Sequence, residues 1–544
     1  MTNETTDRSA VLDSAHVGDL QGAFGTIRRG DVAPRTGTSM RLKTLLAVIG
    51  PGLIVMVGDN DAGAFSTYTQ AGQNYGTRLL WTLLFLVPVL YVNQEMVLRL
   101  GAVTGVGHAR LILERYGRFW GAFSVIDLFV LNALTIVTEF IGISLGLTYL
   151  GLPKVPGVIV AALLVIAAVS TGSFRRFERI CMFLIAGSLT LIPIALALHP
   201  PARAIAHDFL VPGLPEGGQF STVMLLIIAI VGTTVAPWQL FFQQSYVIDK
   251  RITPRFIRYE RVDLWIGIVI VIVGAGAMMA FSTAAFAGTA GQGNFTDTLG
   301  VAEGIGAAAG HWAGVLFAIA LIDACIIGAA AVGLSASYAL GDVLGLHHSL
   351  HRRPSEAKAF YAIFSGLLII SAVIVIIPGS PLGLLTEGVQ TLAGVLLPSA
   401  TVFLLLLCND RGVLGPWVNG RGLNVFSGVV ISVLVMLSIV LTASVLFPGI
   451  TAGQILAIFA AGTILMLFAG VYLAWAARHR AQGQVKPAAE PILDRATWRM
   501  PPLALMTRST LSAGTRTGLT VLRGYLLVAS ALVVVKVVQL ALGH

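Results

Sequence analysis

Residues 58–64 read Gly-Asp-Asn-Asp-Ala-Gly-Ala and lie in the middle of an apolar run that extends from Thr44 to about Gly76. A carboxylate at the centre of a membrane helix costs roughly +2.5 to +3.5 kcal/mol on insertion scales, so it usually faces a protein-lined cavity and a partner. Gly63 has a weak helix propensity and lets the chain leave helical geometry, which exposes backbone carbonyls as ligands. The stretch therefore predicts an interrupted membrane helix in which Asp61 is a candidate cation ligand.

A second apolar run, from Thr222 to Val247, is interrupted at residues 232–239, which read Gly-Thr-Thr-Val-Ala-Pro-Trp-Gln. Pro237 has no N–H and its ring clashes with the preceding turn, so the carbonyl of Thr233 loses its helical partner. Two interrupted helices, each the first in its half of a long membrane chain, are typical of a transporter with a midplane site. The alternative is a pair of packing kinks, because Gly and Pro are common in membrane helices.

The composition is that of a polytopic membrane protein. Of the 544 residues, 56% are hydrophobic and 11% charged, and the mean hydropathy is +0.85, which excludes a soluble globular fold. The net charge of +9 comes from basic residues in the loops between apolar runs, so it indicates topology and not nucleic-acid binding. The three cysteines stand singly and form neither a disulfide framework nor a metal motif. Residues 1 to about 40 lack the apolar core of a signal peptide.

Twelve spans of about 20 mostly apolar residues are expected. They lie near residues 44–72, 80–103, 120–150, 156–173, 178–198, 220–248, 262–288, 313–345, 359–378, 384–408, 424–447 and 453–476. A thirteenth candidate, from Leu519 to Leu542, contains Arg523 and Lys536 and either spans the membrane or lies along its surface.

Basic residues concentrate in alternate loops, including Lys250, Arg251 and Arg255 after the sixth span, and this pattern predicts a multi-pass protein of the cell membrane with a cytoplasmic amino terminus. Spans 1–5 and 6–10 then have opposite topology, so the expected fold is an all-α inverted repeat of five plus five helices with about two extra helices. The expected parts are a cytoplasmic N-terminal segment (1–43), a first repeat (44–200), an inverted second repeat (220–408), two peripheral helices (424–476), a cytoplasmic linker (477–518) and an extra transmembrane or interfacial helix (519–544).

The motifs at both interruptions resemble those of a known family. Residues 61–64 and 70–72 are similar, at the matching spacing, to a family motif Asp-Pro-Gly-Asn followed by Gln-Ala-Gly. Residues 233–238 are similar to its motif Ala-Thr-Val-Met-Pro-His, and residues 99–105, 139–142 and 409–415 match further stretches. The family is the natural resistance-associated macrophage protein (Nramp) group, and the resemblance covers roughly residues 44 to 475. It implies a LeuT-like fold and a transporter of divalent metals, not an enzyme.

The resemblance also implies which residues hold the ion. In the family the motif Asp, Asn and Met and two backbone carbonyls form the site, so Asp61, Gly58 and Thr233 carry over, whereas the Asn position is Ala64 and the Met position is Ala236. Sulfur suits transition metals, and carboxylate, carbonyl and water suit Mg²⁺. The two alanines also leave room for the waters that Mg²⁺ keeps. The expected substrate is therefore a partly hydrated Mg²⁺, with Mn²⁺ tolerated, as in the Nramp-related magnesium transporter branch.

Other polar residues near the interruptions are candidates for the wall of the site. Trp238, Gln239, Asp59 and Thr234 are expected to line it. For the last three, a hydrogen bond at a helix end is an equally acceptable role.

The residues that couple the family to protons are largely replaced. An Asp in the third span becomes Ile136, and two histidines of the sixth span become Trp238 and Gln243, neither of which titrates near neutral pH. Proton coupling is therefore not expected, and Glu139, Gln243 and Asp323 are the remaining candidates for an ion or proton path. For Asp323 the alternative is an interhelical hydrogen bond in a close-packed face.

Three alternatives remain open: a proton-coupled Mn²⁺/Fe²⁺ importer, an organic-solute symporter in which Asp61 pairs with an amine or amino acid, and a non-transporting receptor or scaffold. No resident cofactor, nucleic acid or protein partner is expected, only a divalent cation substrate and membrane lipid. His347, His348 and His351 are expected in a solvated loop and not in a metal site, since the neighbouring arginines oppose a bound cation.

Overall fold

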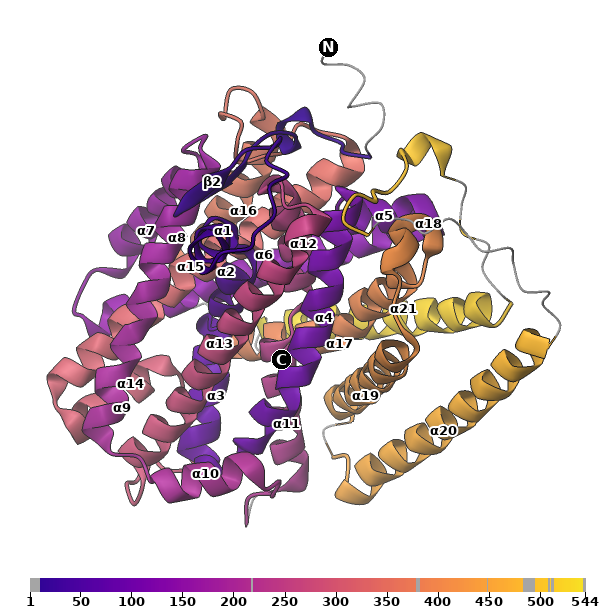
Figure 1. The fold of residues 1–544 in the computed structure, drawn as a ribbon. Helices are drawn as coiled ribbons and strands as arrows, with labels where there is room; N and C mark the ends of the chain where they lie inside the picture. Colours follow the sequence, from indigo (N-terminus) through magenta and orange to yellow (C-terminus); the bar gives the residue numbers. More distant parts are fainter. Residues whose placement is uncertain are drawn as a thin grey trace.

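The computed structural model describes residues 10–216, 219–377, 382–447, 449–482, 495–506, 509 and 513–541. These residues form a bundle of long helices with one two-stranded hairpin, and the helices run between two ends of the molecule (Figure 1). Among them, nine helices are long and apolar enough to cross a membrane, and eleven if each of two bent pairs forms one span. A shorter apolar helix, Lys154–Val169, lies where the fourth span was expected.

The elements follow the expected spans closely. The first half contains α1 (Thr38–Val48), α2 (Pro51–Gly58), α3 (Ala62–Tyr75), α4 (Trp81–Thr104), α5 (His108–Tyr116), α6 (Arg118–Tyr149), α7 (Lys154–Val169), α8 (Phe174–Gly187), α9 (Leu191–Leu198) and α10 (Ala202–Leu210). The second half contains α11 (Phe220–Thr234), α12 (Pro237–Asp249), α13 (Ile257–Phe286), α14 (Thr298–Ala309), α15 (His311–Leu344), α16 (Lys358–Ile376) and α17 (Leu382–Cys408). The remaining helices are α18 (Arg411–Leu414), α19 (Arg421–Leu446), α20 (Ala452–Gln482) and α21 (Ala513–Ala541).

The first expected span consists of three helices, because the chain breaks twice. The break between α2 and α3 falls at Asp59–Asp61, as predicted. The other break was not predicted: α1 and α2 meet at a 49° bend at Gly50, which has φ +153°. Only glycine adopts this backbone conformation readily, and Pro51 at the first position of α2 has no N–H to satisfy.

The second interruption is also confirmed. α11 ends at Thr234, residues 235 and 236 are not helical, and α12 begins at Pro237. Proline suits the first helical position, where an N–H would have no partner inside the helix. The expected sixth span is therefore two helices joined by a two-residue break.

The packing places the interrupted helices inside the bundle. α13 packs along α2, α3 and α4, and α15 packs along α6. α12 packs against both α4 and α15, so the second half of the sixth span is enclosed. By contrast, α20 lies at the side of the bundle and is largely exposed (Figure 1).

The thirteenth candidate forms a helix, α21, that begins six residues earlier than expected, and residues 542–544 lie outside the described part of the chain. α21 packs against α17 and α19, and its Tyr525 hydroxyl is 2.7 Å from the Ser438 hydroxyl. It is not among the described helices that are long and apolar enough to cross a membrane. The preceding linker is shorter than predicted, since α20 continues to Gln482; residues 483–494 are not described.

The N-terminal segment is folded onto one end of the bundle. β1 (Leu20–Gly22) and β2 (Gly25–Ile27) form an antiparallel hairpin that packs on α1. Asp13 accepts hydrogen bonds from Arg352 (2.7 Å) and from the backbone N–H of His348 (2.9 Å). His348 is therefore buried, and the expectation of a wholly solvated histidine loop was wrong because the N-terminal segment covers it.

Lys250 was expected in the loop after the sixth span, and its side chain is fully buried. Its Nζ donates to the Glu178 carboxylate (2.5 Å) and to the carbonyl of Ile49 (2.7 Å), which the bend at Gly50 leaves accessible. The carboxylate of Asp263 accepts from the backbone N–H of Gly52 (2.7 Å) at the same bend. A buried ion pair thus joins the first bend to α8 and α12.

Candidate metal site

Asp61 caps the start of α3. Its side chain accepts a hydrogen bond from the backbone N–H of Ala64 (3.0 Å), a typical N-cap contact. One oxygen of Glu139, on α6, accepts from the backbone N–H of Ala62 (3.2 Å), and the carboxyl groups of Glu139 and Asp61 are in hydrogen-bonding contact. The first break therefore carries two buried acids from different helices.

The two interruptions are joined by side-chain hydrogen bonds. The amide nitrogen of Gln239, on α12, donates to the Asp59 carboxylate at the first break and lies 3.4 Å from the carbonyl of Thr234 at the second. Gln94, on α4, donates to the amide oxygen of Gln239 (3.0 Å). The hydroxyl of Tyr68, on α3, lies 2.7 Å from that of Thr234. The prediction that the two breaks meet is therefore consistent with these contacts.

Several buried oxygen atoms around the breaks have no hydrogen-bond partner among the described residues. They are Asp59 Oδ2, Gln94 Oε1 and Thr233 Oγ1. Because a buried polar atom without a partner is costly, each such atom needs an ion, a water or another unrecorded partner. Oxygen donors of this kind suit a hard divalent cation that retains water.

The expected small residues line the same region. A Cβ built on Gly58 would lie 3.7 Å from the ring of Trp238 and 3.4 Å from Ile327, so the end of α2 faces the start of α12. Ala236 is the N-cap of α12, and Ala64 lies in the first turn of α3. The carbonyl of Trp238 accepts a hydrogen bond from Ser335 (3.0 Å), which fixes the second break against α15.

The polar wall residues have different roles. Asp59 and Gln239 bridge the two interrupted helices instead of capping a single helix end. Thr234, however, donates its hydroxyl to the carbonyl of Ile230 (2.5 Å), the local contact that was the alternative for this residue.

Asp323 and Gln243, the other two candidates for an ion or proton path, have surroundings that differ from those of Glu139. A Cβ on Gly187 would lie 2.5 Å from the Asp323 carboxylate, so Asp323 packs against α8 and is half-buried. Gln243 is fully buried on α12, and neither atom of its amide has a partner among the described residues. Gln243 thus extends the set of unpaired polar atoms along α12, whereas Asp323 belongs to a helix contact.

The structure adds three residues that sequence reasoning missed: Gln94, Tyr68 and Cys325. The thiol of Cys325 contacts Glu139, from the face of α15 that packs on α6. A signal existed for Gln94, because residues 93–95 are Asn-Gln-Glu in the middle of an otherwise apolar span. Tyr68 and Cys325 gave no such signal, since tyrosine and cysteine are common in apolar cores.

No group of three His, Cys, Asp or Glu side chains with the geometry of a metal site occurs in the described ranges. An ion at the breaks would therefore take only part of its coordination from side chains. Backbone carbonyls and water would supply the rest. Two interrupted helices in contact, with buried acids at the first break, define the class: a secondary transporter of the LeuT-like fold.

Comparison with known proteins gives the family. The model of the natural resistance-associated macrophage protein-like family matches residues 52–444. The divalent metal cation transporter MntH of Ralstonia nicotianae is 30% identical over 396 residues, covering 70% of this chain and 86% of the relative. MntH of Bacillus subtilis is 27% identical over 424 residues, covering 73% and 92%. The chain belongs to the Nramp family and is a membrane transporter, not an enzyme.

The fold is shared with solved structures as well. The Eremococcus coleocola manganese transporter, in complex with an aromatic bis-isothiourea compound, matches with a TM-score of 0.64 and 21% identity over 82% of this chain and 96% of that one. The LeuT-like inverted repeat expected from the sequence is thereby confirmed.

Proposed function

We propose that this protein imports divalent metal cations into the cytoplasm and that its site holds a partly hydrated Mg²⁺, with Mn²⁺ tolerated. One observation carries the proposal: Asp61 is a buried carboxylate at the first break, two residues from Asp59, which is hydrogen-bonded to Gln239 of the second interrupted helix. Membrane-buried acids mark ion pathways when they face a polar interior. The relatives named divalent metal cation transporters support the general activity.

In this proposal Asp61 anchors the ion, and the carbonyls of Gly58 and Thr233 approach it from the two breaks. Pro237 supports the role of Thr233, because it has no N–H to donate to that carbonyl. Asp59 contributes charge at short range, since its second oxygen is unpaired. The small side chain of Ala236 leaves the coordination to oxygen and water, which favours Mg²⁺ over softer ions.

We further propose that the amino terminus is cytoplasmic and that transport proceeds without a coupled proton. The first part rests on the alternation of basic loops. The second rests on Ile136, Trp238 and Gln243, none of which can exchange a proton near neutral pH.

One observation favours a second candidate, proton-coupled Mn²⁺ import. Two carboxyl groups in hydrogen-bonding contact, such as Asp61 and Glu139, hold a shared proton unless a cation separates them. Displacement of that proton by the ion would couple the two movements.

Flux in proteoliposomes distinguishes the two candidates. We expect uptake of both Mg²⁺ and Mn²⁺, competition of Mg²⁺ against Mn²⁺ at comparable concentrations, and no change in internal pH beyond that of protein-free liposomes. Internal acidification that follows Mn²⁺ uptake, together with no Mg²⁺ uptake, would establish the second candidate instead. Absence of any ion flux would contradict both.

A further inference from the structure

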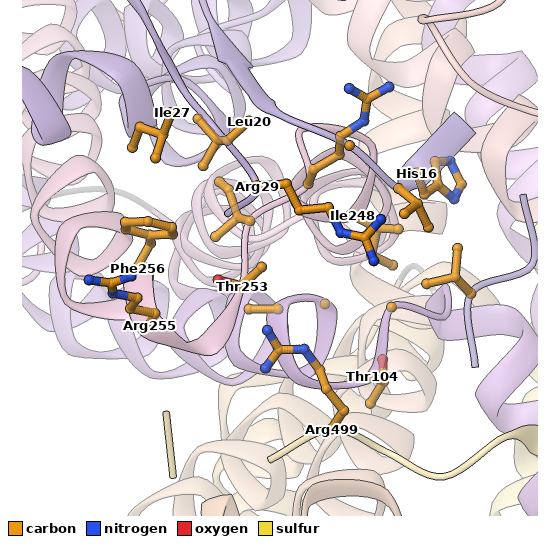
Figure 2. A pocket seen from close by; sticks show the side chains of 18 of the residues that line it. His16, Leu20, Ile27, Arg29, Thr104, Ile248, Thr253, Arg255, Phe256 and Arg499 are labelled. Carbon is orange, nitrogen blue, oxygen red and sulfur yellow. The ribbon is translucent and has the colours of Figure 1, made fainter. Parts of the chain in front are cut away.

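A cavity of about 480 Å³ lies at the end of the bundle that carries the N-terminal segment. Its walls come from residues 10–32, from the end of α4, from residues 248–256, which form the end of α12 and the connection to α13, and from residues 496–500 (Figure 2). These four segments are far apart in the sequence. The segments that form the cavity are not those that contain the two breaks. None of the cavity residues belongs to the proposed ion site.

Five arginines line this cavity: Arg28, Arg29, Arg251, Arg255 and Arg499. Figure 2 shows the side chains of Arg29 and Arg499 pointing into the space from opposite sides. The lining contains one carboxylate, Asp31, and this group is already paired with Arg35 at 2.7 Å. The cavity therefore carries an excess of positive charge.

The arginines obtain their hydrogen bonds from neutral groups. Arg251 donates to the backbone carbonyls of Ala15 (2.7 Å) and Asp19 (3.0 Å). Arg255 donates to the carbonyls of Asp31 (2.6 Å) and Ala33 (2.5 Å). Such contacts fix the guanidinium groups in place, while Asp19 and Asp249 near Arg251 and Asp31 near Arg255 offset part of their charge.

The guanidinium of Arg499 donates to the carbonyl of its neighbour Trp498 (3.0 Å). Desolvation lowers the pKa of Arg499 to about 10, so the group remains charged at neutral pH. His16, on the opposite wall, adds no charge at neutral pH because burial lowers its pKa. An anion in the cavity would relieve the repulsion among the arginines.

Much of the remaining lining is apolar and includes Leu20, Ile27, Ile252 and Phe256. Guanidinium groups match the geometry of phosphate oxygens, and an apolar wall beside them suits the organic part of a ligand. The volume is within the range of small-molecule sites. We propose that this cavity binds a phosphate-bearing organic anion of about nucleotide size, from the face that we assign to the cytoplasm.

Such a ligand would hold together the N-terminal segment, the connection between α12 and α13, and residues 496–500. α13 packs along α2 and α3, the helices on either side of the first break. Binding would therefore stabilise the arrangement seen here and slow any movement that separates these segments. The site would act as a regulatory one, distinct from the ion site.

The test measures binding to the full-length protein in detergent, without divalent cations, with ATP and pyrophosphate as soluble probes. A second arm compares thermal stability in nanodiscs of phosphatidylcholine with and without phosphatidylglycerol, which offers the same phosphate chemistry as a lipid headgroup. We expect saturable binding in at least one arm. The affinity should fall at least tenfold in the double variant Arg29→Gln/Arg499→Gln. It should fall by a smaller factor in the single variant Arg29→Gln. Arg421→Gln, an arginine outside the cavity, should bind like the unmodified protein.

Saturation by ATP or pyrophosphate alone would assign a soluble ligand, and stabilisation by phosphatidylglycerol alone would assign a lipid. Size-exclusion profiles and ligand-free melting temperatures verify that the variants fold. The proposal is overturned if no probe binds saturably, or if folded Arg29→Gln and Arg29→Gln/Arg499→Gln bind as tightly as Arg421→Gln. Because no metal is present, these results do not depend on the proposed ion transport.

Discussion

Gln239 on α12 donates a hydrogen bond to the carboxylate of Asp59, and this contact joins the two interrupted helices. The same amide lies close to the carbonyl of Thr234, so one side chain touches both breaks. In a protein that moves ions by alternating access, a contact of this kind ties the ion site to the relative position of two helices.

Replacement of Ala236 by methionine should restore a soft ligand at the N-cap of α12. We expect Ala236→Met to increase the preference for Cd²⁺ or Mn²⁺ over Mg²⁺ by about tenfold, because sulfur favours these ions by roughly 1.4 kcal/mol or more. Competition between the ions in liposome uptake measures the change. Ala236→Leu has similar bulk without sulfur and should not produce it; an equal shift in both variants, or none in either, would show that this position does not touch the ion.

Removal of the charge on Glu139 should weaken the ion site without breaking the fold. In Glu139→Gln, the amide oxygen can still accept from the N–H of Ala62, but the negative charge beside Asp61 is lost. We expect about tenfold weaker ion binding and a nearly unchanged melting temperature. Cys325→Ser, which retains a hydrogen-bonding group next to Glu139, serves as the matched control and should retain the ion affinity. Unchanged affinity in Glu139→Gln would limit this residue to a structural role.

The buried pair of Lys250 and Glu178 should be important for stability. Lys250→Met leaves the Glu178 and Asp263 carboxylates buried without their cation, and breaking a buried ion pair in this way costs about 3–5 kcal/mol. Thermal unfolding followed by tryptophan fluorescence should show a clear loss of stability. Lys250→Met/Glu178→Leu removes one carboxylate together with its partner and should recover part of the loss. A melting temperature in Lys250→Met equal to that of the unmodified protein would refute this assignment.

Docking of the N-terminal segment should depend on pH. Burial opposes charge on both Asp13 and His348, but a charged neighbour outweighs it in each case. The Arg352 guanidinium holds the pKa of Asp13 well below its usual value. The Asp342 carboxylate raises the pKa of His348 to about 9. The Asp13 contribution is present above about pH 4 and is lost in acid. The His348 contribution is complete below its unfolded value near 6.5 and is lost as the pH rises through about 9. The neighbouring His16 does not reverse this order, because the Asp342 carboxylate is hydrogen-bonded directly to the imidazole of His348 (2.9 Å).

A spin label at the exposed position of Phe24, introduced as Phe24→Cys, measures this docking. The three native cysteines are buried, which favours labelling at the new site. We expect low mobility at pH 6 and higher mobility above pH 9. In Asp342→Asn the upper transition should move to lower pH, and an identical profile in both proteins would contradict the role of His348.

The two transport-related breaks were predictable because each depends on local chemistry: an acid and glycines at residues 58–64, and Pro237 in an apolar run. The contact between Asp59 and Gln239 was not predictable, since it depends on how two distant helices pack. The same holds for Lys250, which sequence position alone places in a loop but which the bend at Gly50 draws into the interior. Burial of His348 likewise requires the N-terminal segment, which lies more than 300 positions away in the chain.

The ion site showed the same division. Asp61, Glu139 and the residues at the breaks were proposed for this site from position and resemblance. Gln94 and Tyr68 were missed because their relevance arises only from contacts with Gln239 and Thr234. Asp323 was placed on a candidate path from its depth in a span, but its contact with Gly187 depends on the packing of α15 against α8.

The most direct test of the account is a titration of the purified protein with Mn²⁺ and with Mg²⁺, compared with Asp61→Asn. Asparagine retains the size and the capping oxygen for Ala64 but removes the charge, so the fold should persist while both ions lose at least tenfold in affinity. Phe24→Cys, far from the breaks in sequence, should bind both ions normally. Asp61→Asn with undiminished affinity for both ions would contradict the claim that this acid anchors the transported cation.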